Sequence, residues 1–490
     1  MAGKPIRRKE FLRLSLLAGA GVYLTGCFNH HKKAATVPPG NTVSQKNIIP
    51  ENAGAKDTVI LHKKGEPGYE ALRNGFNKRI NKYPAVIAEC HSTEDVAQAV
   101  KYAIRNKLQI CIKSGGHSFE GYSSNNDGMV INLSAMNSIT WEGDNIIHAG
   151  PGCKLGQLYA EILPKNKLLP GGSCAGVGLG GLTLGGGYGL FGRKYGLTCD
   201  SLTEVIMVDG EGNIHSSKND PELLWACRGG GNGNFGIITQ MTFALHDAPP
   251  HLQCTRFNIK VPDAAKAKEV LERWFKLSRP LPPSCFSAFV LMDARLYILL
   301  ANCGAETDEV KRFTDGLSPL TTRTRKGNPT PLITAVKIFY GIQHPLYFKN
   351  ASAGLYEGFD EVAPFIEDVL QKVIATPGMT YQVNTLGGRI ADKDLESFSA
   401  FPHRQKLYLS ELQTYWQAGE RTDGMIAKFE EVQQIFRSNS ITAQYTSYPD
   451  IECKDWQTAY YGNNYPRLQK VKRKYDPNNH IWYEQSVRLV

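Results

Sequence analysis

The spacing of apolar residues in the first half of the chain alternates between the period of a helix and that of a strand. In the segment 93–106, apolar residues recur on one helical face, and Ser92 is suited to cap the N-terminus of that helix. The short apolar run 109–112 that follows has the length of a buried strand. Together these patterns predict a layer in which helices pack on a sheet.

Further elements follow at short intervals, separated by glycine-rich loops. The pattern predicts strands at 129–133, 146–149 and 237–245, helices at 155–163 and 222–227, and a hairpin over 205–215 that turns at Asp209-Gly210. After Pro249-Pro250 the glycine clusters stop, and the predicted helices become longer, at 263–276, 358–373 and 423–438. We therefore predict an α+β protein with a domain boundary at residue 248.

The N-terminus has the organisation of an export signal. Basic residues precede an apolar stretch, 12–24, which ends in Leu24-Thr25-Gly26-Cys27. This ending resembles a bacterial lipobox, in which Cys27 is acylated and anchors the mature chain to a membrane; a buried helix that ends in a cysteine is the alternative. Arg7-Arg8 also resembles a twin-arginine (Tat) export signal. Residues 1–27 are thus predicted to be a signal peptide with a lipobox.

The remaining chain of this 490-residue protein is long enough for two domains, since 42% of all residues are hydrophobic. Residues 28–50 mix Lys, Pro, Gly, Asn and Ser and are predicted to be a tether. We expect a first domain at 51–247, a second at 248–455, and a C-terminal segment, 456–490.

The formal net charge of +10 does not indicate a nucleic-acid partner. The first 33 residues hold seven Lys/Arg residues against one acidic residue, so the chain after them carries only about +4. The basic run 470–474 is expected to be the solvated face of the last helix, and His403-Arg404 to brace a sheet. The eleven cysteines lack the paired spacing of a metal site, so no metal is predicted.

Two glycine motifs, 187–192 and 231–236, match G-x-G-x-x-G, the fingerprint of a Rossmann dinucleotide site. That fingerprint requires a strand before it and a helix after it, and neither motif has this context. Glycines nevertheless let backbone N–H groups approach a large, flat or anionic ligand closely. The glycine clusters therefore favour a dinucleotide other than NAD.

Several motifs resemble, in their order and spacing, those of berberine bridge enzyme-like FAD-linked oxidases of the vanillyl-alcohol-oxidase superfamily. The motifs are Lys-Ser-Gly-Gly-His-Ser at 113–118, the glycine clusters 170–178 and 184–189, the segments 193–197 and 225–236, and the closing segments 475–479 and 484–486. The resemblance implies a two-part FAD-binding domain of the PCMH type. It also implies a substrate domain with an antiparallel sheet backed by helices, after which 456–490 returns to the FAD-binding domain.

The resemblance also assigns residues to the cofactor. It implies that FAD is bound covalently, through His117 to the flavin 8-methyl group and through Cys174 to ring carbon 6. The alternatives are a packed loop histidine and a small buried thiol. The further residues expected to bind FAD are Lys113, Ser114, Gly115, Gly116, Ser118, Gly172, Val177, Gly178, Gly181, Gly185, Gly186, Tyr188, Gly189, Gly233, Asn234, Gly236, Ile237 and Asn464.

Oxidation of an alcohol needs a base that takes the hydroxyl proton while hydride leaves the carbon. The resemblance places Tyr448 where related oxidases have a tyrosine base, whose pKa of ~10 a positive charge or the flavin would have to lower. It makes Glu411, on a predicted strand with Leu409, a second base or a sugar contact. The alternatives are an ordinarily packed tyrosine and an exposed strand carboxylate.

The resemblance implies an FAD-linked oxidase that acts on CH–OH groups of a small molecule, such as a carbohydrate or a secondary alcohol. Val177, a small residue three positions after Cys174, favours oxygen as acceptor and hydrogen peroxide as product. Two alternatives remain: a dehydrogenase of the same fold with a quinone or protein acceptor, and a non-catalytic flavin-bearing surface lipoprotein. The expected contacts with a membrane are made only through the lipid anchor.

Overall fold

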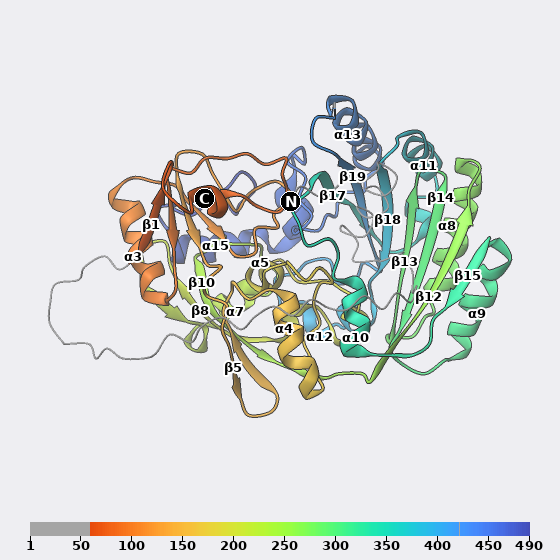
Figure 1. Cartoon of the computed structure of the whole chain (residues 1–490), viewed down its shortest axis with the longest axis horizontal. Coiled ribbons are helices and arrows are strands. Elements are labelled where there is room, and N and C mark those ends of the chain that lie inside the picture. The colour runs from red at the N-terminus through yellow and green to blue at the C-terminus, as the bar shows by residue number, and fades with distance from the viewer. Residues whose placement is uncertain (1–58, 421) are drawn as a thin grey trace.

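The computed structural model describes residues 59–490 except residue 421 (Figure 1). The predicted signal peptide, lipobox and tether lie outside the described residues. Within the described part of the chain, no helix is both long and apolar enough to cross a membrane.

The first layer is a four-stranded sheet covered by a capped helix. Its strand order is β1-β2-β4-β3; β2 and β3 run parallel to β4, and β1 is antiparallel to β2. The predicted helix is confirmed as α3, in which Ser92 and Asp95 form a capping box. Its apolar face packs on Val86 and Met129 of the sheet. The bounds are β1 Ile60–Lys63, α2 Tyr69–Arg73, β2 Val86–Glu89, α3 Thr93–Arg105, β3 Ile110–Lys113 and β4 Met129–Asn132.

A second, five-stranded sheet has the order β5-β6-β10-β8-β9 and is antiparallel. The predicted hairpin is confirmed by the pairing of β8 with β9. The glycine motif 231–236 leads directly into strand β10, which is not the context of a Rossmann site. The bounds are β5 Ile139–Glu142, β6 Ile146–Ala149, α4 Leu155–Ile162, β7 Lys167–Leu168, α5 Leu179–Leu184, α6 Gly192–Tyr195, β8 Leu202–Val208, β9 Ile214–Ser216, α7 Pro221–Cys227, β10 Ile237–Ala244 and β11 His246–Asp247.

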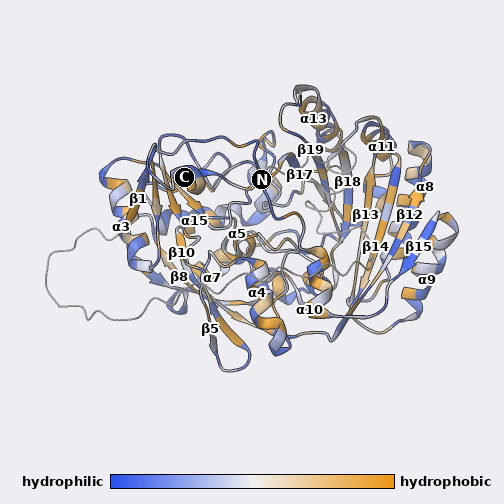
Figure 2. Ribbon diagram, in the orientation of Figure 1, coloured by the Kyte–Doolittle hydropathy of each residue, from blue (hydrophilic) through white to orange (hydrophobic). Residues whose placement is uncertain are grey.

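The second half of the chain forms a large antiparallel sheet of order β15-β12-β14-β13-β18-β19-β17, with β16 paired to β12. Apolar residues run along its central strands, whereas the edge strand β15 is hydrophilic (Figure 2). The strand bounds are β12 His251–Lys260, β13 Cys285–Met292, β14 Arg295–Asn302, β15 Arg323–Lys326, β16 Thr330–Pro331, β17 Tyr347–Tyr356, β18 Met379–Thr385 and β19 Tyr408–Trp416.

One face of this sheet is covered by four helices, α8, α9, α11 and α13 (Figure 1). Their buried side chains form a separate core around Trp274, which is fully buried. The predicted helix 423–438 is confirmed, but the one predicted at 358–373 begins only at Ile366, because the preceding residues form a short 3₁₀ turn before Pro364. The bounds are α8 Ala264–Ser278, α9 Asp308–Leu317, α10 Leu332–Ala335, α11 Ile366–Ala375, α12 Asp394–Phe398 and α13 Asp423–Ser438.

The end of the chain, with α14 Trp456–Tyr461 and α15 Tyr465–Tyr475, packs back against the first half. Ile481 pairs with Ile110 beside β3. The prediction that the basic run 470–474 is solvated is wrong for Lys472, which is fully buried. Its ammonium lies 2.6 Å from Asp476, because a buried charge requires a partner of opposite charge.

Arg404 links the two halves of the molecule. Its guanidinium, which is 1% exposed, donates to both carboxylate oxygens of Asp200, at 2.6 and 2.9 Å. Arg404, predicted from the sequence to brace a sheet, therefore joins the second half of the chain to the first.

Candidate active site

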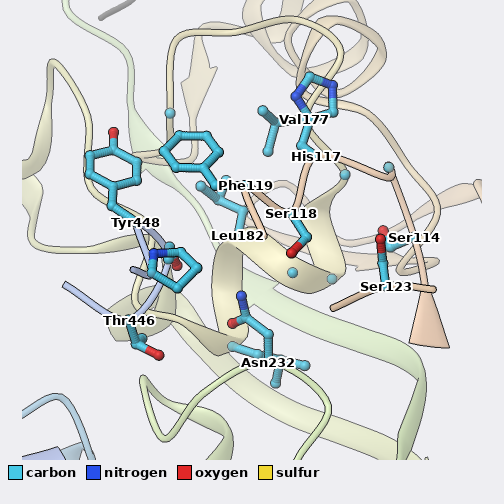
Figure 3. A pocket seen from close by; sticks show the side chains of 18 of the residues that line it. Ser114, His117, Ser118, Phe119, Ser123, Val177, Leu182, Asn232, Thr446 and Tyr448 are labelled. Atoms are coloured by element: carbon cyan, nitrogen blue, oxygen red, sulfur yellow. The ribbon is translucent and has the colours of Figure 1, made fainter. Parts of the chain in front are cut away.

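A deep cavity lies where the large sheet faces the first half of the chain (Figure 3). One wall consists of glycine-rich loops, and the opposite wall consists of side chains from β13, β17, β18 and β19. The large sheet thus has two different faces, since helices cover one of them and the other lines the cavity. The glycine-rich segments 170–178, 184–189 and 231–236 all contribute residues to the first wall.

The loop that carries His117 and the loop that carries Cys174 touch through their backbones. A Cβ atom added to Gly115 would lie 2.3 Å from the amide nitrogen of Gly178. No side chain larger than that of glycine fits at such a distance. This contact brings both predicted flavin ligands to the same wall, where they line the cavity.

His117 is held by an aromatic contact and by burial. Its ring stacks on Phe76 with centroids 4.3 Å apart and an angle of 15°. Burial, and secondarily the charge of Lys154, lowers the pKa of His117 to about 4. The imidazole is therefore uncharged at neutral pH.

Cys174 follows Ser173 on the cavity wall. Desolvation, with a smaller contribution from the carboxylate of Glu411, raises the pKa of its thiol to about 12. In the absence of a bond to another group, this thiol is protonated at neutral pH.

Tyr448 lies in the cavity at the end of a loop that pairs with β17. Its carbonyl oxygen accepts a hydrogen bond from the amide of Ser352, at 2.8 Å. Its ring lies beside that of Phe119 (Figure 3) and stacks on it, with centroids 5.2 Å apart and an angle of 13°. It also meets the ring of Tyr445 edge-on. Burial, followed by the charges of Glu411 and Tyr188, raises the pKa of Tyr448 well above its usual value near 10. The phenol therefore carries its proton at neutral pH.

Glu411 is fully buried, so the interpretation as an exposed strand carboxylate is wrong. It lies on β19 between Ser352 of β17 and Gln382 of β18, which are its partners on the neighbouring strands. Neither carboxylate oxygen has a well-formed hydrogen bond among the described residues. Burial raises the pKa of Glu411 well above its usual value, and the nearby Gln413 offsets only part of that rise. A neutral carboxyl group therefore lies beneath the cavity floor.

Sequence reasoning missed the polar side chains that form this floor. Asn350, Gln382 and Tyr415 line the cavity; the two amides are 2% and 1% exposed, respectively. Asn350 donates to the Tyr415 hydroxyl at 2.9 Å, but its own oxygen and that of Gln382 accept no hydrogen bond among the described residues. The available signal was the alternation of polar and apolar residues in the strands, with the polar ones directed away from the helices.

Most residues predicted to bind FAD line the cavity, but six of them, and one of the two predicted catalytic residues, do not. The cavity-lining ones are Ser114, Gly115, Gly116, His117, Ser118, Gly172, Cys174, Val177, Gly178, Gly181, Tyr188, Gly189, Gly233 and Gly236. The positions outside the lining are Lys113, Gly185, Gly186, Asn234, Ile237 and Asn464, together with Glu411 of the predicted catalytic pair.

The positions outside the lining have structural contacts of their own. The Lys113 ammonium donates to the carbonyls of Leu72 and Asn74 at the end of α2. Asn234 donates to the carbonyl of Gly230 and accepts from the amide of Val487, which ties the C-terminus to the glycine loop. Lys113 and Asn234 therefore stabilise neighbouring backbone segments by hydrogen bonds instead of lining the cavity.

The cavity wall fits a dinucleotide such as FAD. Several consecutive positions present backbone rather than side chains to it, which permits close approach of a large ligand. A Cβ on Gly181 would meet nothing within 4 Å, although the residue lines the cavity, so this space is left open for something other than the chain itself. The buried Asn232 oxygen, which also faces the cavity, accepts no hydrogen bond among the described residues.

Comparison with known proteins agrees with this geometry. Residues 84–218 match the family model described as an FAD binding domain, and residues 444–488 match the model described as berberine and berberine like. YgaK of Bacillus subtilis, an FAD-linked oxidoreductase, is 33% identical over 443 residues, which cover 86% of this chain and 95% of the relative. A carbohydrate oxidase of Microdochium nivale is 28% identical over 468 residues, which cover 87% of this chain and 92% of the relative.

Solved structures share the fold over nearly the whole described chain. BBE-like 1 of Physcomitrella patens has a TM-score of 0.81 at 22% identity, with 89% of this chain and 98% of that chain covered. A chitooligosaccharide oxidase has a TM-score of 0.80 at 24% identity, with the same coverage.

The fold and the cavity thus define an FAD-dependent oxidoreductase. The chain belongs to the berberine bridge enzyme-like family of FAD-linked oxidoreductases.

The open space at Gly181 gives a test of the cofactor site. We expect Gly181→Ala to leave the thermal stability of the flavin-free protein unchanged or slightly raised, because alanine favours helix α5 and its methyl group meets no neighbour. The same methyl group occupies cofactor space, so the flavin content of the purified protein should fall. Gly424→Ala in α13, which also adds a methyl group to open space, is the control and should keep its flavin. Full flavin content in Gly181→Ala would contradict the assignment of this wall to FAD.

Proposed function

We propose that this protein oxidises a CH–OH group of a carbohydrate-like small molecule, with FAD held covalently through His117 and Cys174. The observation that carries the proposal is the floor of the cavity. Buried acceptor atoms of Asn350 and Gln382, which line the cavity, and of Glu411, beneath its floor, accept no well-formed hydrogen bond from the described residues. Leaving such atoms unpaired costs about 1–3 kcal/mol each, and hydroxyl groups of a bound substrate would satisfy them.

The flavin of FAD supplies the hydride acceptor. Tyr448 supplies the base, because it lines the cavity together with residues of both the flavin wall and the polar floor. The described residues that act most strongly on its pKa all raise it, so the lowering must come from the bound cofactor or substrate. This geometry allows Tyr448 to take the hydroxyl proton as the hydride leaves.

Glu411 acts in its neutral form. A protonated carboxyl group both donates and accepts a hydrogen bond, which suits a substrate hydroxyl better than a buried charge does. Its register partners are Ser352 and Gln382, and Gln382 lines the cavity, so Glu411 supports the polar floor from beneath. We therefore assign substrate positioning to Glu411, and proton removal to Tyr448.

His117 and Cys174, the two residues proposed to bond to the flavin, have different roles. The neutral His117 ring offers a lone pair, which a bond to the flavin methyl group requires. A second bond through Cys174 would prevent loss of the cofactor outside the cytoplasm. Val177 lines the cavity beside them, and its small side chain favours access of oxygen, with release of hydrogen peroxide. The alternative is a dehydrogenase with a quinone or protein acceptor.

Relatives with named substrates support the reaction class. They include the carbohydrate oxidase described above and an aclacinomycin oxidase of Streptomyces galilaeus that is 27% identical over 521 residues. A non-catalytic flavin carrier is disfavoured, because Tyr448 lies in the cavity and Glu411 adjoins its floor.

We further propose that the protein is exported and anchored to a bacterial membrane through acylated Cys27. The support is the sequence Leu24-Thr25-Gly26-Cys27 after an apolar stretch. Radiolabelled palmitate should label the wild-type chain in a bacterial host, and Cys27→Ser should abolish the label. Equal labelling of both proteins would contradict the lipobox.

The base assignment is tested with Tyr448→Phe. Anaerobic flavin reduction by a panel of sugars and secondary alcohols should slow about 10²–10⁴-fold, because the phenylalanine cannot accept the proton. In the wild-type protein the rate should rise with pH, since the deprotonated phenol is the active form and its pKa lies above neutral; in Tyr448→Phe this dependence should vanish. Tyr347→Phe, at the start of β17 and outside the cavity, is the control. An unchanged rate and pH profile in Tyr448→Phe would exclude the tyrosine as base.

A further inference from the structure

A buried group of charges lies directly behind the active site, where three segments of the chain meet. Its centre is Lys349 of β17, which is 3% exposed. The Lys349 ammonium lies 2.5 Å from Glu120 and 2.8 Å from Asp450. Both carboxylates are themselves buried, at 6% and 4% exposure. None of these three side chains lines the cavity.

The two carboxylates belong to the loops that carry the reacting side chains. Glu120 follows His117 by three residues, and Asp450 follows Tyr448 by two. Lys349 therefore ties the loop of the predicted flavin ligand to the loop of the predicted base. Phe119, which directly precedes Glu120, and Tyr448, which lies two residues before Asp450, stack their rings on each other (Figure 3).

Further charges complete the group and balance it. Arg79 donates to Glu120 at 2.6 Å and to the carbonyl of Phe119 at 3.2 Å. Arg437 of α13 donates to Asp450 at 3.2 Å and pairs with Glu430 at 3.3 Å. Three cations thus face three carboxylates. Burial alone would lower the pKa of Lys349, but the combined attraction and hydrogen bonds of Asp450 and Glu120 outweigh it and hold that pKa above its usual value.

Such a group is a poor way to gain stability. Removing several charges from water costs free energy that their mutual attraction only partly returns, and apolar side chains of similar volume often stabilise a core as well or better. What buried ion pairs can provide is a fixed geometry between segments. In this protein the fixed segments are those that must bring base and cofactor within reacting distance.

We propose that Lys349 is a positioning residue that sets the Tyr448 hydroxyl relative to the flavin held by the His117 loop. The proposal rests on the proposed function, because it assigns Lys349 a role in the same site. Lys349 touches neither substrate nor cofactor; it acts through Glu120 and Asp450. A shift of about 1 Å in the position of a base is enough to slow a reaction by about 100-fold.

The test compares Lys349→Met with Lys349→Met/Asp450→Asn. The single variant leaves two buried carboxylates without their shared cation and is expected to lose thermal stability. The double variant removes one charge of each sign, so the group stays balanced and the protein should fold and retain its flavin. Lys406→Met is the matched control, because Lys406 also bridges two carboxylates, Glu357 and Glu361, but lies away from the cavity.

We expect the flavin-reduction rate constant at saturating substrate to fall about 10- to 100-fold in the double variant, with the substrate dissociation constant changed less than threefold. Lys406→Met should reduce as the parent does. A rate within twofold of the parent in the double variant, at full flavin content, would overturn the proposal and leave Lys349 a purely structural role.

Failure of the proposed function gives a different pattern. If no hydroxyl-bearing compound reduces the parent flavin, the proposed function fails, and Lys349 is then judged by the visible circular dichroism of the bound flavin. This spectrum reports the surroundings of the ring and should change in the double variant but not in Lys406→Met. Identical spectra in all three proteins would overturn the positioning role.

Discussion

The contact between two glycine-rich loops decides where the reactive side chains of this protein lie. Added Cβ atoms on Gly115 and Gly178 would each lie within 2.4 Å of the other residue's amide nitrogen. Gly178 has an ordinary extended backbone, with φ −78° and ψ 138°, so there the requirement is space rather than a left-handed conformation. Because the backbones touch here, His117 and Cys174 share one wall of the cavity.

The large sheet supplies the opposite wall. One of its faces packs against helices, and the other lines the cavity. The face under α8, α9, α11 and α13 is apolar and makes the core. The other face carries amides, hydroxyls and the Glu411 carboxyl group, and several of their atoms have no hydrogen-bond partner in the described part of the chain. Burying these polar groups without hydrogen bonds lowers the stability of the folded protein. We therefore interpret the floor as a surface that binds a substrate rather than one that stabilises the fold. Arg404 and Lys349 then fix this wall against the flavin side.

Local signals in the sequence predicted local structure well. Ser92 as a cap and the apolar stripe predicted α3, and the predicted bounds 423–438 match α13. The failures involve side chains whose burial or partners no local pattern reveals. Nothing in the run 470–474 distinguishes Lys472, which is buried because Asp476 and the carbonyl of Ile481 receive its ammonium. Lys349 meets Glu120 and Asp450 across 229 and 101 positions of sequence, so no spacing rule could pair them. The family motifs identified the flavin wall, whereas the polar floor required the register of β17, β18 and β19.

The most direct test of the central claim is to denature the purified protein in acid, digest it, and measure which peptides carry the mass of the flavin. The account predicts that yellow colour stays with the protein and that peptides containing His117 and Cys174 both carry flavin. Release of all flavin into the supernatant would contradict covalent attachment at this wall and, with it, the assignment of both ligands.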